Sequence, residues 1–182
     1  CETVLCSMET NQIDFQFTKE LAESGDCIAQ YNLALKYTED PIIKKDLNEG
    51  IRLLKLSSKQ GFIPAHNQLG DIYENGLGTE QNYSEAFKYY KIASDSGDLK
   101  GQFALGCLYQ HGLGVEKDYI EAVRLYKLSA DQGFMSGYFN LGVMYHNGIG
   151  VEVNLKEAMK YYIDAAKKGH GRAFYNIGTI YA

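Results

Sequence analysis

The sequence predicts an all-α protein, an α/α solenoid of 36-residue helix-turn-helix repeats. Glycine recurs at this interval through most of the chain, tyrosine follows the same interval, and each interval holds two helical apolar patterns separated by a glycine-rich turn. The aligned residues are Tyr73, Tyr109, Tyr145 and Tyr181, then Gly70, Gly106, Gly142 and Gly178, then Gly25, Gly61, Gly97, Gly133 and Gly169. A fixed period of about 20–50 residues is typical of stacked supersecondary units, whose long surfaces favour binding.

The first helix of each repeat, helix A, is expected at Ile63–Glu74 in the best-defined copy. Ala65, Leu69 and Tyr73 follow one another at intervals of four residues, which places them in one stripe on a helix. Gly70 lies inside this helix, where glycine costs about 1 kcal/mol relative to alanine. We therefore expect the next helix to pack closely over this glycine in each repeat.

A glycine pair is expected to form the turn after helix A. In Gly76-Leu77-Gly78 both glycines suit positive φ, and the leucine between them is expected to fill the space between the helices. The segments 112–115 and 148–151 repeat the pattern. They are not phosphate-binding loops, because no strand precedes them, a third glycine is missing and no Gly-Lys-Ser/Thr follows.

The second helix, helix B, is expected to begin at Asn82, with Ala86, Phe87, Tyr90 and Ala93 on its buried face and Gly97 as its left-handed C-cap. An Asp or Asn at its start, with Glu three residues later, is typical of a capping box. A basic residue lies three residues after each Glu, on the face of the helix that is expected to be solvated. Catalytic acid–base pairs are the alternative interpretation, and capping explains the pattern better. The aligned sets are Asp46, Asn82, Asp118 and Asn154, then Glu49, Glu85, Glu121 and Glu157, then Arg52, Lys88, Arg124 and Lys160.

The period divides the chain into a flank, four complete repeats and the first helix of a fifth, which gives ten helices. A helix of the B type is expected in the flank at Ile13–Glu23, and the last helix A near Arg172. The first repeat has Asp40-Pro41-Ile42 in place of Gly-x-Gly, so we expect a different turn there. The divisions are 1–24, 25–60 (the divergent first repeat), 61–96, 97–132, 133–168 and 169–182.

These residues together resemble the Sel1-like repeat family, which is related to the tetratricopeptide repeats. The family pattern is Ala-x(3)-Leu-Gly-x-x-Tyr, then Gly-x-Gly, then a second helix with Ala and Tyr that ends in Ala-Ala-x-x-Gly. The resemblance covers roughly residues 25–182, and two copies carry it most fully. The matching residues are Ala65, Leu69, Gly70, Tyr73, Gly76, Gly78, Ala86, Tyr90, Ala93 and Gly97, and Leu141, Gly142, Tyr145, Gly148, Gly150, Val151, Ala158, Tyr162, Ala165, Ala166 and Gly169.

The resemblance implies a right-handed superhelix that works as an adaptor or scaffold and not as an enzyme. Family members occur in signalling complexes, in membrane-protein degradation and in bacterial proteins that meet host cells. Secreted bacterial members often carry paired cysteines in each repeat, which this chain lacks. That difference favours the cytoplasm, of the protein's own cell or of a host, over an oxidising compartment.

Composition excludes several classes of function. The net charge of −5 and the mixing of acidic with basic residues argue against nucleic-acid binding. No run of 18 apolar residues occurs, so we expect no membrane insertion. Cys1, Cys6, Cys27 and Cys107 do not follow the period, which argues against a zinc site or a disulfide ladder; a local Cys1–Cys6 bridge stays open. With no nucleophile–base pair, carboxylate pair or metal cluster, we expect no catalytic site and no cofactor.

The predicted binding site is the concave groove that helix A lines in this architecture, on the face opposite Leu69 and Tyr73. Aromatic and amide side chains recur there, and they suit an extended peptide, whose backbone the amides can bind. The alternative is that the rings pack between neighbouring A helices and the asparagines bond internally. The candidate residues are Tyr31, Asn32, Asn67, Gln68, Phe103, Phe139, Asn140, Tyr175 and Asn176.

The favoured function is a protein-interaction scaffold with a protein or peptide partner. The alternative is a repeat module that regulates or targets a catalytic or membrane domain elsewhere in its protein. The last helix A has no helix B after it, and Ile177 and Tyr181 are expected to expose apolar surface there. We therefore expect self-association through the repeat ends, or a further helix that covers this surface.

Overall fold

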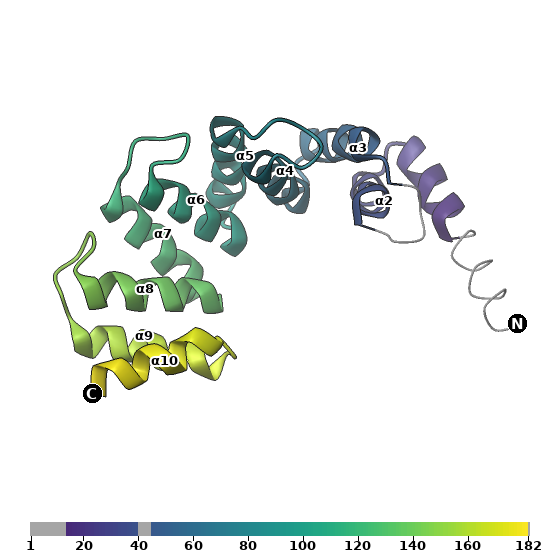
Figure 1. The fold of residues 1–182 in the computed structure, drawn as a ribbon. Helices are drawn as coiled ribbons and strands as arrows, with labels where there is room; N and C mark the ends of the chain where they lie inside the picture. Colours follow the sequence, from purple (N-terminus) through teal and green to yellow (C-terminus); the bar gives the residue numbers. More distant parts are fainter. Residues whose placement is uncertain (1–13, 40–44, 182) are drawn as a thin grey trace, which may run out of the picture. The chain divides into compact units, whose positions relative to one another are not determined.

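The computed structural model describes residues 14–39 and 45–181, and within these ranges it contains helices and no strand. Residues 14–23 form the first described helix, as expected for the flank. The remaining helices begin at intervals that keep the period (Figure 1). Their bounds are α2 Cys27–Glu39, α3 Leu47–Lys59, α4 Ile63–Asn75, α5 Tyr83–Asp95, α6 Leu99–His111, α7 Tyr119–Asp131, α8 Met135–Asn147, α9 Leu155–Lys167 and α10 Gly171–Tyr181. The all-α repeat prediction is confirmed.

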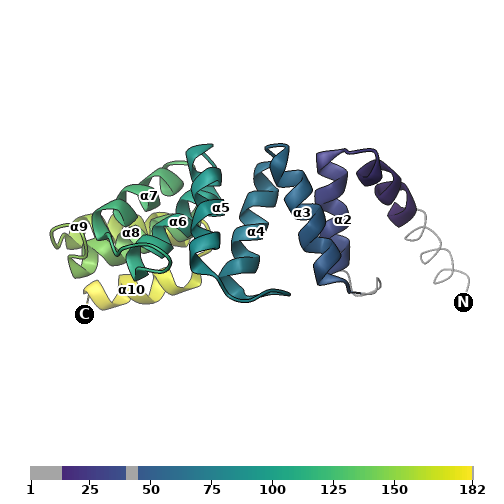
Figure 2. The ribbon, with the colours of Figure 1, turned by 90° about the horizontal axis from the view of Figure 1, so that it is seen from above.

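The chain divides into two compact units, residues 1–81 and residues 82–182. In the first unit, α3 packs against both α2 and α4, and Figure 2 shows these three helices side by side. In the second unit, consecutive helices from α5 to α10 pack against one another. The turn expected at Asp40-Pro41-Ile42 and the first two cysteines lie outside the described residues.

The B helices are capped as the sequence predicts. The side chains of Asp46, Asn82, Asp118 and Asn154 each accept a hydrogen bond from the backbone N–H of the Glu three residues later, at 3.0 Å. The reciprocal half of the capping box is wrong, because Glu49, Glu85 and Glu121 bind the basic residues that follow them. The backbone N–H of Asp118 instead donates to the carbonyl of Tyr109, on the preceding helix A. The capping residue therefore joins the two helices of one repeat.

We expect the substitution Asp118→Ala to lower the free energy of unfolding by about 1 kcal/mol. The Asp118 carboxylate accepts from the N–H groups of Ile120 and Glu121, and alanine leaves both groups without it. Urea unfolding followed by circular dichroism measures the change. Asp118→Asn is the matched control, because asparagine caps the same position in two other repeats. A loss as large for asparagine as for alanine would contradict the capping role.

The glycine pairs adopt the backbone that the sequence predicts. Gly112 and Gly114 both have φ of +70°, and the pairs at 76/78 and 148/150 are alike. The expected filling by the central residue holds for Ile149, which packs against the core around Tyr126. It is wrong for Leu77, whose side chain is 52 % exposed. Positive φ is therefore the shared requirement of these turns, whereas filling of the gap differs between repeats.

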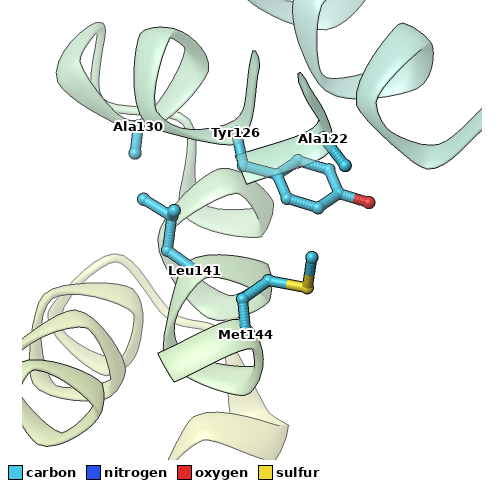
Figure 3. Packing of buried hydrophobic residues seen from close by; sticks show 5 residues of the cluster. All are labelled: Ala122, Tyr126, Ala130, Leu141 and Met144. Atoms are coloured by element: carbon cyan, nitrogen blue, oxygen red, sulfur yellow. The ribbon is translucent and has the colours of Figure 1, made fainter. Parts of the chain in front are cut away.

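In the second unit the helix B tyrosines lie in the core, whereas the first repeat has the buried Leu54 at that position. Tyr126 lies with Ala122, Ala130, Leu141 and Met144 in one buried cluster (Figure 3). A Cβ added to Gly106 would lie 2.8 Å from the Tyr126 ring, and one added to Gly142 would lie 2.5 Å from the Tyr162 ring. The expectation that helix packing explains the glycine inside helix A is confirmed at these two positions.

The last helix differs from the expectation in one respect. Ile177 is half-buried against Ala158, Tyr162 and Ala165. The expectation of an exposed Ile177 is therefore wrong, and the side chain of Tyr181 lies outside the described residues.

Candidate binding surface

Four of the predicted groove residues lie in the first unit. Tyr31 and Asn32 are on α2, and Asn67 and Gln68 are on α4. The half-buried Tyr31 ring meets Phe62 edge-on, with 5.3 Å between the ring centroids. Asn32 is exposed, whereas Asn67 and Gln68 are half-buried. Gln68 also lines a small cavity with residues of the turn 76–78 and of α3.

The other five predicted residues lie in the second unit, on three successive A helices. Phe103 is on α6, Phe139 and Asn140 are on α8, and Tyr175 and Asn176 are on α10. All are half-buried except Tyr175, which is 76 % exposed.

Tyr126 of α7 connects two of these residues. Its ring centroid lies 5.6 Å from that of Phe103. Its hydroxyl donates to Gln110 Oε1 at 2.6 Å and lies 3.4 Å from Cys107 Sγ, and the Asn140 side chain acts as a hydrogen-bond donor that lowers its pKa. The buried tyrosine thus ties α6 to α8 through polar and aromatic contacts on the predicted binding face.

Tyr162 of α9 repeats this arrangement one period later. Its ring centroid lies 5.9 Å from that of Phe139, and its hydroxyl lies 3.4 Å from His146 Nδ1. The Asn176 side chain acts on the same hydroxyl as a hydrogen-bond donor that lowers its pKa. The structure therefore brings Phe103 together with Asn140 around one tyrosine, and Phe139 together with Asn176 around the next.

The electrostatics keep these hydroxyl groups neutral. Burial raises the pKa of Tyr126, and it also raises the pKa of Tyr162; in both, the hydrogen bond to asparagine opposes the shift. At neutral pH both groups are hydrogen-bonding phenols, so they serve to position side chains and are poorly suited to proton transfer.

Each partly exposed ring also packs on the residue just before the next helix A. The Phe103 and Phe134 rings meet edge-on with centroids 5.2 Å apart, and Phe139 stacks on the His170 ring at 4.1 Å. The internal packing weighed as the alternative is therefore present for these two phenylalanines. Because both side chains are half-buried, each also presents part of its surface.

Tyr126 and Tyr162 stand at the repeat position of Tyr90, which the sequence predicted only on the buried face of helix B. Their hydroxyl groups reach Gln110 and His146, two residues that occupy the same position of consecutive A helices. The 36-residue spacing of the polar residues Gln110 and His146 was the sequence signal that could have indicated this contact with the tyrosine hydroxyl groups. His170 was missed because no periodic residue type predicted its stacking.

We expect acid to destabilise the folded chain through His170. Burial, and then the charge of Arg172, lower the pKa of this imidazole below 6.5. The unfolded chain therefore takes up the proton first, so stability is complete above the ordinary pKa and falls as the pH drops through that value and below. His170→Phe places the residue found at 62 and 134, in the same position of two other repeats. Melting temperatures from pH 7.5 to 5.5 should fall less in this variant, and an equal fall would refute the role of His170.

The described residues contain no cluster of His, Cys, Asp or Glu that could hold a metal ion. Cys27 and Cys107 are half-buried, and neither forms a disulfide with another described residue. Among the described helices, none combines the length and apolar character needed to cross a membrane.

The sequence profile of the Sel1 repeat matches residues 27–62, 63–98, 99–134 and 136–170. The fold is similar to that of c5321, a protective antigen of uropathogenic Escherichia coli strains with an SLR fold, at a TM-score of 0.89 and 34 % identity over 92 % of this chain. It is also similar to a Sel1 repeat protein from Oxalobacter formigenes, at a TM-score of 0.86 and 30 % identity over 93 % of this chain.

This chain spans 36 % of the length of the Escherichia coli protein and 68 % of the Oxalobacter protein. The comparison with curated proteins gave no match. The four profile matches together cover most of the chain, and they agree with the helical repeats of the structure. This chain therefore belongs to the Sel1 repeat family.

Proposed function

We propose that the chain binds an extended peptide segment of a protein partner along one surface of its second unit. This A-row surface consists of Phe103, Phe139, Asn140, Tyr175 and Asn176. Sel1 repeat proteins are generally protein-interaction modules and are typically non-catalytic. The proposal assigns that general role to particular side chains.

The observation that carries the proposal is the repeated set of ring, tyrosine and asparagine. Phe103 and Phe139 are held by buried tyrosines and by the residues before the next helix A. Rings that are already held in place lose little conformational entropy when a partner binds. Aromatic anchors commonly dominate interfaces, and amide groups can bond the backbone of a peptide. The internal contacts therefore support binding by preorganising the surface.

The distance between neighbouring repeats also suits an extended peptide. Equivalent residues of packed repeats are expected to lie on the order of 10 Å apart, the usual distance between packed helices. About three residues of extended peptide, at roughly 3.3 Å each, span that distance. One peptide could thus place a side chain against each ring in turn.

The test begins with peptides selected from a random phage-displayed library on the wild-type chain. Fluorescence polarisation then gives their Kd for Phe139→Ala and Asn140→Ala chains. We expect binding to weaken about 30-fold for Phe139→Ala, the equivalent of about 2 kcal/mol at an aromatic anchor. Circular dichroism melts identify any loss that comes from unfolding.

The matched control is the double substitution Lys88→Ala and Arg124→Ala on the B helices. Both side chains are exposed, and each pairs with the Glu three residues before it. Binding should persist in this variant. If it disappears there and survives Phe139→Ala, the partner binds the B-helix face and the assignment to the A-row surface is wrong.

A second candidate is a repeat module that regulates or targets a catalytic or membrane domain of a larger protein. The observation in its favour is that the Escherichia coli relative is much longer than this chain. Activity of the complete protein, measured with and without Phe139→Ala, separates the two roles. A change in that activity without any added partner favours the second role.

A further inference from the structure

A cavity of about 290 Å³ lies in the first unit between three helices, the helix over residues 14–23, α2 and α3. The buried side chains of Ala22, Leu33 and Leu53 line it, together with Tyr37. We call it the repeat-1 cavity, because α2 and α3 belong to the repeat at residues 25–60. Pockets for drug-sized ligands typically hold about 300–1,000 Å³. This cavity therefore has room for about one large side chain.

In repeat 4, at residues 133–168, a tyrosine occupies the corresponding space. Tyr161 of α9 stands three periods after Leu53. Its ring stacks on Tyr145 of α8 at 5.6 Å between centroids, and it lies 6.5 Å from the ring of Tyr138. Both ring partners stand at positions that line the cavity in repeat 1. Because leucine is smaller than tyrosine, repeat 1 leaves open the space that the ring fills in repeat 4.

The charged groups around this space also correspond. In repeat 4, Lys160 Nζ lies over the Tyr161 ring, 5.8 Å from its centroid. Burial raises the pKa of Tyr161 most, and the nearby charges of Glu157 and Asp131 add to that shift. The residues at these three positions of the repeat-1 cavity are Arg52, Glu49 and Glu23. An incoming ring would therefore meet one cation and two carboxylates, as Tyr161 does.

We propose that the repeat-1 cavity takes an aromatic side chain from a peptide segment of a partner protein. The ring would lie against Tyr37 and beside Leu53, as Tyr161 lies against Tyr145. The Arg52 guanidinium bonds Glu49 through Nε and one terminal nitrogen, which leaves its flat face available to the ring. Contacts between a guanidinium and an aromatic face are favourable.

The rim of the cavity suits a peptide better than a free aromatic molecule. It carries two ion pairs, Lys19–Glu23 at 3.9 Å and Arg52–Glu49 at 2.6 Å, one on each of the two helices that flank α2. All four side chains are partly exposed. They place hydrogen-bond donors and acceptors of both signs beside the opening, where the backbone on either side of an inserted ring would pass. This site goes beyond the proposed function, because it lies in the first unit and uses none of the A-row residues.

The space is open because of the residue type at position 53, and not because a helix is missing. Its counterpart in repeat 4 is bounded by α7, α8 and α9, and the three equivalent helices are all described around the repeat-1 cavity. Repeat 3 also has leucine here, Leu125, whereas repeats 2 and 4 have Tyr89 and Tyr161. Eight of the ten residues that line the cavity recur unchanged in repeat 3, among them Tyr109 and Arg124. Leucine at this position is therefore a shared feature of the odd repeats.

The first probe is p-cresol, which reproduces the tyrosine side chain alone. Titration of the ¹⁵N-labelled chain with millimolar p-cresol should shift the amide signals of residues 30–37 and 49–56. The second probe is a set of peptides selected from a random phage-displayed library on the wild-type chain, after depletion on the Leu53→Tyr chain. These peptides should share a Phe, Tyr or Trp, and replacing that residue by alanine should weaken binding at least tenfold.

Leu53→Tyr is the decisive variant. The new ring should fill the cavity from within, as the tyrosine does in repeat 4, so the melting temperature should stay unchanged or rise. Binding of p-cresol and of the selected peptides should weaken at least tenfold. Arg52→Ala offers a second test at a partly exposed position and should weaken peptide binding about threefold. Arg52→Lys should restore most of that loss, because Lys160 holds this place over Tyr161.

Tyr161→Leu is the matched control in repeat 4. This substitution opens the corresponding space, so the melting temperature should fall. In the folded variant p-cresol should shift amide signals of α8 and α9 that it leaves unchanged in the wild-type chain. A folded variant without this gain would remove the argument drawn from repeat 4.

Three further results would overturn the proposal. The first is an absence of shifts around the cavity at millimolar p-cresol, and the second is binding that Leu53→Tyr leaves unchanged. The third is binding of p-cresol without any selected peptide that depends on Leu53, because the cavity would then hold a free small molecule. The test is separate from that of the A-row surface: Phe139→Ala should spare the peptides that Leu53→Tyr rejects, and Leu53→Tyr should spare those that need Phe139.

Discussion

Gly114→Ala is expected to lower the free energy of unfolding by about 3 kcal/mol, because two unfavourable effects add. The residue has φ of +70°, and a left-handed backbone costs a non-glycine residue about 1–2 kcal/mol. The new Cβ would also overlap the backbone carbonyl group of Tyr83 and lie 2.7 Å from the backbone nitrogen of Ser84. Backbone atoms cannot rotate away as a side chain can, and overpacking typically costs about 1–3 kcal/mol. Urea unfolding followed by circular dichroism measures the loss.

Gly97→Ala separates the two effects. Gly97 also has positive φ, at +83°, but a Cβ there would meet nothing within 4 Å. Only the backbone term applies, so the expected loss is about 1 kcal/mol. Equal losses in the two variants would show that the contact between the turn at Gly114 and the start of α5 is unimportant for stability.

Tyr126→Ala is expected to lower the free energy of unfolding by about 3–5 kcal/mol, the range for removing a large aromatic side chain from a core. The side chain is completely buried and packs with Leu141 and Met144 (Figure 3). Its ring also lies against Gly106, so the alanine variant leaves a cavity beside this glycine. Thermal and urea unfolding measure the loss.

Tyr126→Phe is the matched control, because it keeps the ring and removes only the hydroxyl. The lost hydrogen bond to Gln110 should cost about 1 kcal/mol. Affinity for peptides selected on the A-row surface should fall in this variant, because Asn140 loses the group that positions it. A loss of stability as large as that of the alanine variant would mean that the polar contacts, and not the ring, carry the stability.

The regular features of the repeat are predictable because they depend on residues close together in the sequence. An Asp or Asn cap bonds an N–H three residues later, and a glycine accommodates positive φ by itself. The reciprocal capping bond failed as a prediction because the N–H of Asp118 finds the Tyr109 carbonyl on another helix. A local pattern cannot show a competing acceptor that only packing brings near.

An alternation between odd and even repeats became visible only from the side-chain contacts in the structure. Gln132 donates to the Gly97 carbonyl and to Gln102, and Gln60 makes the same bonds to Gly25 and Gln30. These sets lie 72 residues apart, so the first and third repeats share a polar link that different residue types replace in the second and fourth. The residues were visible in the sequence, but their pairing spans 30 or more positions.

The candidate binding surface, too, could be predicted from the sequence only in part. Periodicity placed Phe103, Phe139, Asn140 and Asn176 at equivalent positions of helix A, because a helix of known register determines which residues share a face. It could not show that Tyr126 and Tyr162 lie beneath them with bonded hydroxyl groups. That outcome depends on how two helices approach each other, which the side chains of both determine together.

The family, the helices, the caps and the glycine turns can be predicted from the sequence, because each follows from a short-range backbone preference repeated every 36 residues. Which equivalent residues are covered depends on how the helices pack. Leu77 and Leu113 are the same residue type at the same position of the period, yet Leu77 is exposed and Leu113 is half-buried. The physical reason is that burial belongs to a pair of surfaces, so identical local sequences differ wherever their neighbours differ.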